Sequence, residues 1–266
     1  MFIADYHTHS LHSPDGRDPV ERLCESALLA QMKELVITDH FEGVQNKMYT
    51  SPFYYNECRN DCRAAAAAYE GRLKVLFGIE LGQPHFDPKG CSAMLDKKEF
   101  DFVIGSMHNL SGDRDIYFFD YKRIDHEKIF KEYVDELIDM AKFGDFDVVG
   151  HLNYPARYMW AQARKTVNLA NYEEQWRELF RLLKEKGRGI EINTSGLRQS
   201  IGITLPPLYL VRLFFECGGE VVTVGSDAHT GGDVGKNITD AYALLREAGF
   251  SYVAAFEGRK ARFEKI

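Results

Sequence analysis

The chain has 266 residues, of which 45% are hydrophobic and 13% aromatic, so it contains enough apolar material for a large folded core. Its formal net charge of −7 argues against a broad nucleic-acid-binding surface, because neutralising phosphates requires clustered Lys and Arg side chains. An anionic substrate would therefore have to be attracted locally, by bound cations and a few arginines.

Strand and helix patterns alternate along the chain, which is typical of parallel β-α-β units. Short β-branched runs predict strands at residues 2–4, 35–37, 75–79, 102–105, 148–150, 190–192 and 221–224. Helices are expected over about residues 19–31, 57–69, 125–143, 172–186 and 205–216, and a closing hairpin over 252–263. For the first helix we expect Asp18 as N-cap and Pro19 in the first turn. No repeat or linker divides the sequence, so we expect one domain spanning residues 1–266.

Each of the seven predicted strands ends close to a polar side chain that can bind a metal or lie beside one. In chain order these are His7 with His9, His40, Glu80, His108, His151, Asn193 and Asp227. Because the carboxyl ends of barrel strands open at one mouth, this phasing predicts an α/β fold, a βα barrel with a metal cluster at its top.

The residue types favour a multinuclear site. His7 and His9 are separated by one residue on a predicted strand, so both imidazoles point to the same face, and Asp227 and His229 repeat this spacing. Nitrogen and oxygen ligands of this kind suit Zn, Mn or Fe. The six histidines and three acidic residues proposed as ligands are too many for one tetrahedral ion.

At these positions the sequence strongly resembles the PHP (polymerase and histidinol phosphatase) superfamily, and most closely its monofunctional histidinol-phosphate phosphatases. The resemblance runs over essentially the whole chain and rests on motifs at residues 5–10, 37–40, 78–80, 106–108, 150–151 and 225–229. It implies a distorted TIM-like barrel of seven βα units that carries a trinuclear metal site.

The family pattern, carried over residue by residue, implies three sites. The first metal would be bound by His7, His9, Glu80 and Asp227, and the second by Glu80, His108 and His151. The third would be bound by Asp15, His40 and His229. In different members of the family the loop ligand is Asp or His, so both Asp15 and His12 are candidates. The position of Asp15 in the motif favours Asp15.

A cluster of this kind predicts phosphomonoester hydrolysis by a metal-activated hydroxide, in which the ions also neutralise the non-bridging phosphate oxygens. Arg157 and Arg198 follow barrel strands on the ligand side, and an arginine fork matches a phosphate. The resemblance to histidinol-phosphate phosphatases implies that the arginines of these two loops bind the phosphate from two sides. Glu42 is either a partner for a substrate ammonium group or a surface acid.

The resulting hypothesis is hydrolysis of L-histidinol phosphate to L-histidinol and phosphate in histidine biosynthesis. One alternative is a PHP phosphoesterase acting on another small phosphate or a nucleotide, and a second is a non-catalytic metal-bound regulatory protein. We expect the protein to bind a small molecule and expect it to bind neither nucleic acid nor a membrane. The sequence predicts no oligomeric state. The absence of an apolar run of about 20 residues and of a signal peptide makes the cytoplasm the expected location.

Several polar residues near the motifs are assigned structural roles. His85 and His126 are expected to be packing residues, Asp39 to bind the backbone, and Asp113 to form a Gly-Asp turn. Asn193 is expected to orient Glu191 or a water. Cys58 and Cys62 are expected to be buried thiols rather than a zinc pair. The aromatic segment 41–55 is either a lid over the substrate or an insertion packed on the barrel rim.

Overall fold

The computed structural model describes residues 2–42, 54–96 and 99–266. Its central feature is a sheet in which the strands are parallel, in the order β1-β2-β4-β5-β8-β9-β10. Their bounds are Ala4–Asp5, Glu34–Ile37, Lys74–Gly82, Phe102–Ser106, Val148–Val149, Gly189–Asn193 and Val222–Gly225. These strands correspond to the seven runs predicted from the sequence, and the βα-barrel expectation is confirmed.

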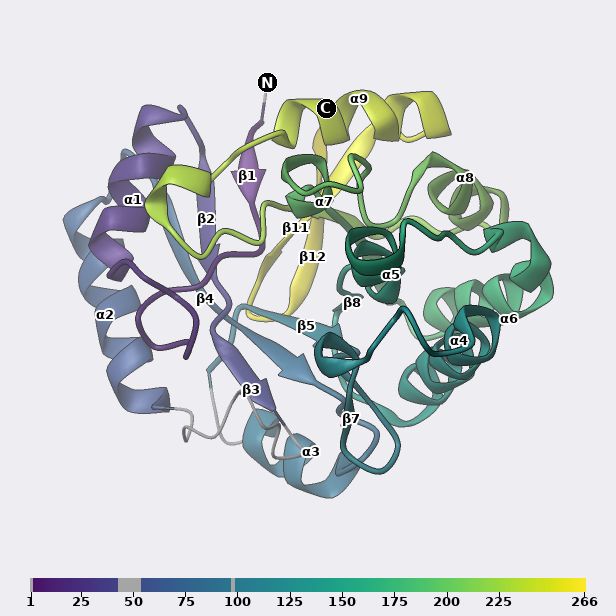
Figure 1. Ribbon diagram of the computed structural model, residues 1–266. Coiled ribbons are helices and arrows are strands. Elements are labelled where there is room, and N and C mark those ends of the chain that lie inside the picture. Colours follow the sequence, from purple (N-terminus) through teal and green to yellow (C-terminus); the bar gives the residue numbers. More distant parts are fainter. Residues whose placement is uncertain (1, 43–53, 97–98) are drawn as a thin grey trace.

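Helices surround this sheet (Figure 1). They are α1 (Val20–Leu29), α2 (Tyr55–Ala68), α3 (Pro88–Asp96), α4 (His126–Phe143), α5 (Pro155–Ala163), α6 (Glu173–Glu185), α7 (Ser195–Arg198), α8 (Leu208–Glu216) and α9 (Ile238–Ala248). Short 3-10 turns lie at Ile116–Phe118, Leu169–Tyr172 and Gly231–Asp233. No helix within the described ranges is both long enough and apolar enough to cross a membrane.

The barrel closes where the first strand meets the last. Thr8 and Ala228 form a parallel bridge, and the Tyr6 amide donates to the Val224 carbonyl at 3.0 Å. The Asp227 amide donates in turn to the His7 carbonyl at 2.8 Å. These contacts bring the carboxyl ends of β1 and β10 together, so ligands from the two ends of the chain face one space.

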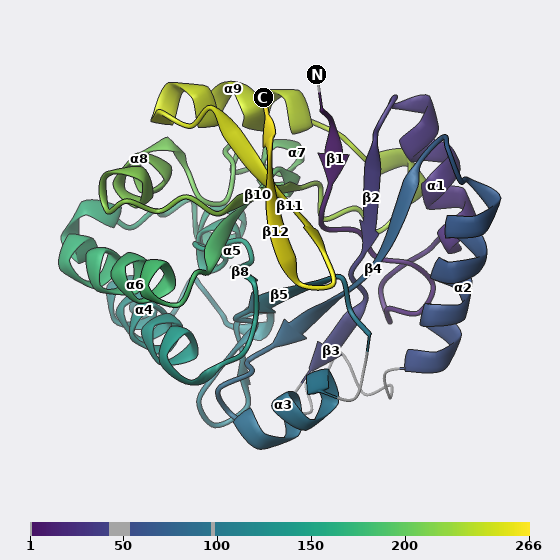
Figure 2. The same cartoon turned by 180° about the vertical axis from the view of Figure 1, so that it is seen from behind.

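The opposite end of the barrel is filled by a hairpin of β11 (Tyr252–Glu257) and β12 (Lys260–Lys265), which confirms the expected closing hairpin (Figure 2). Phe256 packs with Tyr6 and Phe102, at ring-centroid distances of 6.5 and 4.9 Å. Arg259, in the turn, donates hydrogen bonds to Asp145 and Asp147. The hairpin is thus attached to the barrel by both apolar and ionic contacts, away from the ligand end.

Strand sequences rich in Val, Ile and Leu agree with their burial on both faces, as expected for a parallel sheet flanked by helices. The helices are amphipathic: in α6, Trp176, Leu179, Phe180 and Leu183 are buried, while its charged residues face outward. Cys58 and Cys62 lie buried on α2 as free thiols, as expected.

Some local expectations were wrong. Helix α1 begins at Val20, and its N-cap residue is Pro19 without a side-chain cap; Asp18 instead accepts a hydrogen bond from the Gly231 amide at 2.7 Å. Strand β4 does not end at Glu80 but continues to Gly82, because β3 (His40–Glu42) pairs with it there. Helices α3, α5, α7 and α9 were not predicted, nor was the small hairpin of β6 (Asn109–Leu110) and β7 (Arg114–Asp115).

Candidate metal centre

The nine residues expected as metal ligands all lie at the carboxyl ends of the barrel strands. His7 and His9 follow β1, His40 begins β3 and Glu80 lies within β4. His108, His151 and Asp227 each come two residues after the last residue of β5, β8 and β10, respectively. The remaining two, Asp15 and His229, lie in the segments that follow β1 and β10.

Glu80 is at the centre of this group, with a side chain only 1% exposed. Its Oε1 lies 2.9 Å from Nε2 of His151 and 3.2 Å from Nε2 of His108. Its Oε2 lies 3.2 Å from Nε2 of His7 and 3.0 Å from Nδ1 of His40. One carboxylate therefore contacts imidazoles on two sides, which is the geometry required of a bridging ligand.

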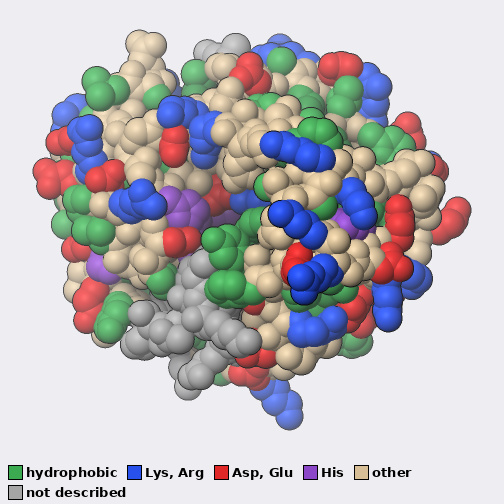
Figure 3. All heavy atoms as spheres, viewed as in Figure 1, with side chains coloured by type: hydrophobic (Ala, Val, Ile, Leu, Met, Phe, Trp, Pro, Cys, Tyr) green, Lys and Arg blue, Asp and Glu red, His purple; other side chains and the backbone are tan. Residues whose placement is uncertain are grey.

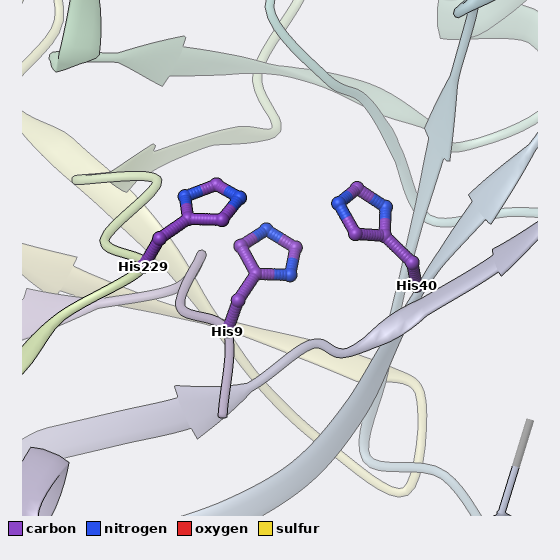
Figure 4. Close-up of side chains that lie close together, drawn as sticks. All are labelled: His9, His40 and His229. Carbon is purple, nitrogen blue, oxygen red and sulfur yellow. The ribbon is translucent and has the colours of Figure 1, made fainter. Parts of the chain in front are cut away.

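A second group of side chains lies at the rim. Nε2 of His229 is 2.9 Å from Asp15, and Nε2 of His40 is 3.7 Å from the same carboxylate. The ring of His9 lies between those of His40 and His229, at 4.3 Å from each (Figure 4). The alternative loop residue, His12, is directed elsewhere, since its Nε2 lies 2.8 Å from Asp61 on α2. The geometry therefore favours Asp15 over His12.

Outer partners orient four of the imidazoles by contacting Nδ1. These contacts are His7 with Glu191 at 2.6 Å, His9 with Ser13 at 3.1 Å, His108 with Glu42 at 2.7 Å, and His229 with the carbonyl of Asp227 at 3.1 Å. In each ring the Nε2 atom is left to face the cluster. This arrangement is the usual one for metal-binding histidines, whose second nitrogen donates to a carboxylate or carbonyl.

One of the two expectations made for Glu42 is wrong. It is not a surface acid, because its side chain is 3% exposed. One of its oxygens contacts Nδ1 of His108, and the other accepts a hydrogen bond from Gln83 at 2.6 Å. β3 pairs with β4 and thereby turns Glu42 toward His108, so the carboxylate is placed to orient that ring.

The buried charges perturb one another strongly. Burial disfavours ionisation of Glu80, but His7, His40 and His108 lower its pKa well below the usual value. Burial likewise opposes protonation of His7, but the carboxylates of Glu191 and Glu80 raise its pKa well above the usual value. Burial and the neighbouring His40 and His229 lower the pKa of His9 to about 4, so His9 offers a neutral nitrogen near neutral pH.

These residues fit a cluster of divalent cations. Nε2 of His7, Nε2 of His9 and Oε2 of Glu80 are buried, and although both nitrogens lie within 3.4 Å of this oxygen, none of the three atoms forms a hydrogen bond of good geometry among the described residues. Leaving such atoms unsatisfied is costly, and a cation would satisfy all three. Three sets of ligand atoms lie within 4.8 Å of one another: His7, His9 and Glu80; His40, Glu80 and His108; and His9, His40 and His229.

Two arginines lie beside the cluster, although both lie in helices rather than in the expected loops. Arg157 is in α5, with its guanidinium 4.4 Å from the centre of the Tyr154 ring and 3.7 Å from Asp227. Arg198 ends α7, where its Nη2 donates to the carbonyl of Ser226 at 2.7 Å. Within the described part of the chain, Nη2 of Arg157 and Nη1 of Arg198 are buried without hydrogen-bond partners.

A cavity of about 200 Å³ opens over the cluster. Beyond Arg157 and the metal-site residues, it is lined by Asp115, Tyr117, Tyr154 and Tyr158. Histidine side chains are visible in this hollow in the space-filling view (Figure 3). None of these four residues was expected at the site from the sequence, where the only signal is the cluster of aromatic residues in the segments after His108 and His151. The proposed lid falls largely on residues 43–53, which lie outside the described residues.

The other polar residues behave largely as expected. Asp39 accepts hydrogen bonds from Ser10 and from the Ser13 hydroxyl, the group that also contacts His9. Nδ2 of Asn193 donates to Glu191 at 3.2 Å. His85 pairs with Glu136 at 3.0 Å, away from the cluster. Gly112 and Asp113 form the turn between β6 and β7, both with positive φ.

Comparisons with known proteins agree with this geometry. The sequence model of the PHP domain family matches residues 5–195. A histidinol-phosphatase from Lactococcus lactis is 28% identical over 96% of this chain and 95% of its own length. A Thermotoga maritima protein named "Probable histidinol-phosphatase" is 27% identical, with 97% of each chain covered.

A solved structure extends the comparison to three dimensions. It is that of a histidinol phosphate phosphatase from Lactococcus lactis, complexed with zinc, L-histidinol and phosphate. The match has a TM-score of 0.87 and 27% sequence identity, and it covers 98% of both chains.

Proposed function

Because the chain belongs to the PHP domain family, we propose that it is a metal-dependent phosphomonoesterase that hydrolyses L-histidinol phosphate to L-histidinol and phosphate. One observation carries the chemistry: the Glu80 carboxylate lies between imidazoles on two sides, in a group of nine candidate metal-ligand side chains of which seven are buried. The named relatives from Lactococcus lactis and Thermotoga maritima support the choice of substrate.

We assign three divalent ions to the cluster. His7, His9, Glu80 and Asp227 would bind the first ion, and Glu80, His108 and His151 the second. Asp15, His40 and His229 would bind the third. The distances around Glu80 and Asp15 support these groups, and the zinc in the Lactococcus lactis structure supports a divalent metal. Zn, Mn and Fe all suit such ligands.

When bound, such ions lower the pKa of water and neutralise charge on a phosphoryl group. The protein's own contribution is orientation. Arg157 and Arg198 would bind phosphate oxygens through their buried guanidinium nitrogens that lack hydrogen-bond partners among the described residues. The stacking of Arg157 on Tyr154 fixes the plane of the guanidinium, so binding phosphate costs little side-chain entropy.

The organic part of the substrate would occupy the cavity beyond the cluster. Tyr117, Tyr154 and Tyr158 supply ring surfaces for an imidazole, and Asp115 supplies a negative charge for a cationic amine. The proposed partner is thus a small molecule. A cytoplasmic location is part of the same proposal, supported by five cysteines that are all unpaired.

The decisive experiment is phosphate release by protein reconstituted with Mn²⁺, Zn²⁺ or Fe²⁺, with histidinol phosphate and a panel of other phosphomonoesters and nucleotides as substrates. We expect kcat/KM for histidinol phosphate to exceed that of the panel by about a hundredfold, or roughly 2.7 kcal/mol. An equal rate on all substrates would favour a phosphoesterase with another substrate. No hydrolysis by metal-loaded protein would favour a regulatory metal-bound protein instead.

A further inference from the structure

Glu191 is an acidic residue that belongs to none of the proposed metal-ligand groups, yet it touches two of them. It lies in β9, between β8 and β10, and is 1% exposed. Its Oε1 is 2.6 Å from Nδ1 of His7, a residue 184 positions away in the chain. Its Oε2 accepts a hydrogen bond from the backbone amide of His151 at 2.8 Å.

Glycines lie on both sides of this carboxylate, and the one at Gly225 leaves the space that it occupies. A Cβ atom on Gly225 would lie 2.4 Å from Oε1 of Glu191 and 2.4 Å from Cβ of His7, so the carboxylate or the ring would have to shift. A Cβ atom on Gly150 would lie 3.6 Å from Oε2, in ordinary contact. The carboxylate therefore fits against both adjacent strand ends, and its two oxygens point in different directions toward His7 and His151.

The hydrogen bond from the His151 amide to Glu191 holds a residue with an unusual backbone conformation. His151 has a φ of +24°, a conformation that residues other than glycine rarely adopt and that costs of order 1 kcal/mol or more. A charge-assisted hydrogen bond to its amide offsets part of this cost and holds the residue in the position from which Nε2 reaches Glu80.

We propose that Glu191 is a positioning residue that fixes ligands of two metal ions at once: the ring of His7 and the backbone of His151. By accepting from Nδ1–H of His7, it selects the tautomer whose Nε2 lone pair faces Glu80. All three groups that contact it, including Nδ2 of Asn193, are donors in this arrangement, so a carboxylate with two accepting oxygens satisfies them all. The inference rests on the proposed metal assignment.

Glu191→Gln tests this with little change in volume. The amide has one accepting oxygen, so either His7 or His151 must face an NH₂ group. We expect the dissociation constants for Mn²⁺ and Zn²⁺, measured by competition with a chelator on the full-length protein, to rise by roughly 10- to 100-fold. Glu136→Gln is the matched control, since it removes a carboxylate from the ring of His85 outside the cluster and should leave metal affinity unchanged.

A second measurement does not depend on the variant folding. In wild-type protein loaded with Zn²⁺, the ¹⁵N signals of His7 should report a protonated Nδ1 and a metal-bound Nε2. The opposite tautomer, or wild-type metal affinity in Glu191→Gln, would overturn the positioning role. Failure of the proposed function is separately visible, because the wild-type protein would then bind no divalent metal or hydrolyse no phosphomonoester.

Discussion

The carboxylate of Glu80 lies 2.9 Å from Nε2 of His151, although the two residues are 71 positions apart. The other oxygen of Glu80 is directed at His7 and His40 on the opposite side. Each proposed ion next to Glu80 therefore depends on the same carboxylate.

Replacing this carboxylate should empty more than one site. We expect Glu80→Ala to lose bound metal and to reduce kcat by at least about a thousandfold, since bound ions supply several kcal/mol of transition-state stabilisation. Metal analysis of the purified protein and a phosphate-release assay measure both effects. Full metal content with normal activity would remove Glu80 from the bridging position.

Arg198 is expected to bind phosphate without holding metal. Its Nη2 is already anchored to the Ser226 carbonyl, which leaves the buried Nη1 for an anion. Arg198→Ala should raise the inhibition constant of inorganic phosphate by about 10- to 100-fold and leave the metal count at the wild-type value. Arg164→Ala, at the exposed end of α5, is the control. An unchanged inhibition constant in Arg198→Ala would exclude the arginine from the phosphate site.

Asp115 is expected to discriminate between substrates. Its carboxylate is 7% exposed and lines the cavity beside three tyrosines. The Asp115 carboxylate accepts a hydrogen bond from the Tyr117 amide at 2.8 Å. Asp115→Asn keeps an oxygen that can accept this hydrogen bond but removes the negative charge that would attract an amine. We expect kcat/KM for histidinol phosphate to fall at least about tenfold, or about 1.4 kcal/mol, and that for p-nitrophenyl phosphate to stay constant. An equal loss on both substrates would indicate a general structural defect.

The hairpin at the closed end of the barrel should make a pH-dependent contribution to stability. The hydrogen bond from Arg259 lowers the pKa of Asp145, although partial burial opposes this. A lowered folded-state pKa stabilises the protein above the unfolded value of about 3.9, and this stabilisation is lost as the pH falls through the folded-state pKa. The effect of Arg259 should therefore be large at neutral pH and small in acid.

Urea denaturation of metal-free protein measures this effect. We expect Arg259→Gln to lower the free energy of unfolding by about 1–2 kcal/mol at pH 7. The lower value of this range is expected, because Asp145 is partly exposed and solvent screens its ion pair with Arg259. The difference from wild type should shrink near pH 3. Arg181→Gln removes an exposed i,i+4 pair with Glu185 and should change stability by less than about 0.5 kcal/mol. A pH-independent difference for Arg259→Gln would show that packing of the side chain, rather than its charge, stabilises the hairpin.

The positions of the seven barrel strands and the polar residues near their ends could be predicted from the sequence. The reason is local: a β-branched run predicts a strand, and the residue that follows it must lie at that strand's carboxyl end. The sequence pattern therefore predicts that His7, Glu80 and Asp227 lie at one mouth of the barrel. The resemblance to the PHP superfamily contributed the grouping into three sites.

The contacts between individual side chains of the site could be found only from the tertiary structure. His12 and Asp15 are three residues apart in one loop, and only the packing of α2 beside that loop directs His12 to Asp61. Glu42 faces His108 because β3 pairs with β4, and Glu191 reaches His7 because β1 and β10 close the barrel. Such contacts join residues tens to hundreds of positions apart, so they depend on strand register and side-chain packing, which no local sequence pattern specifies.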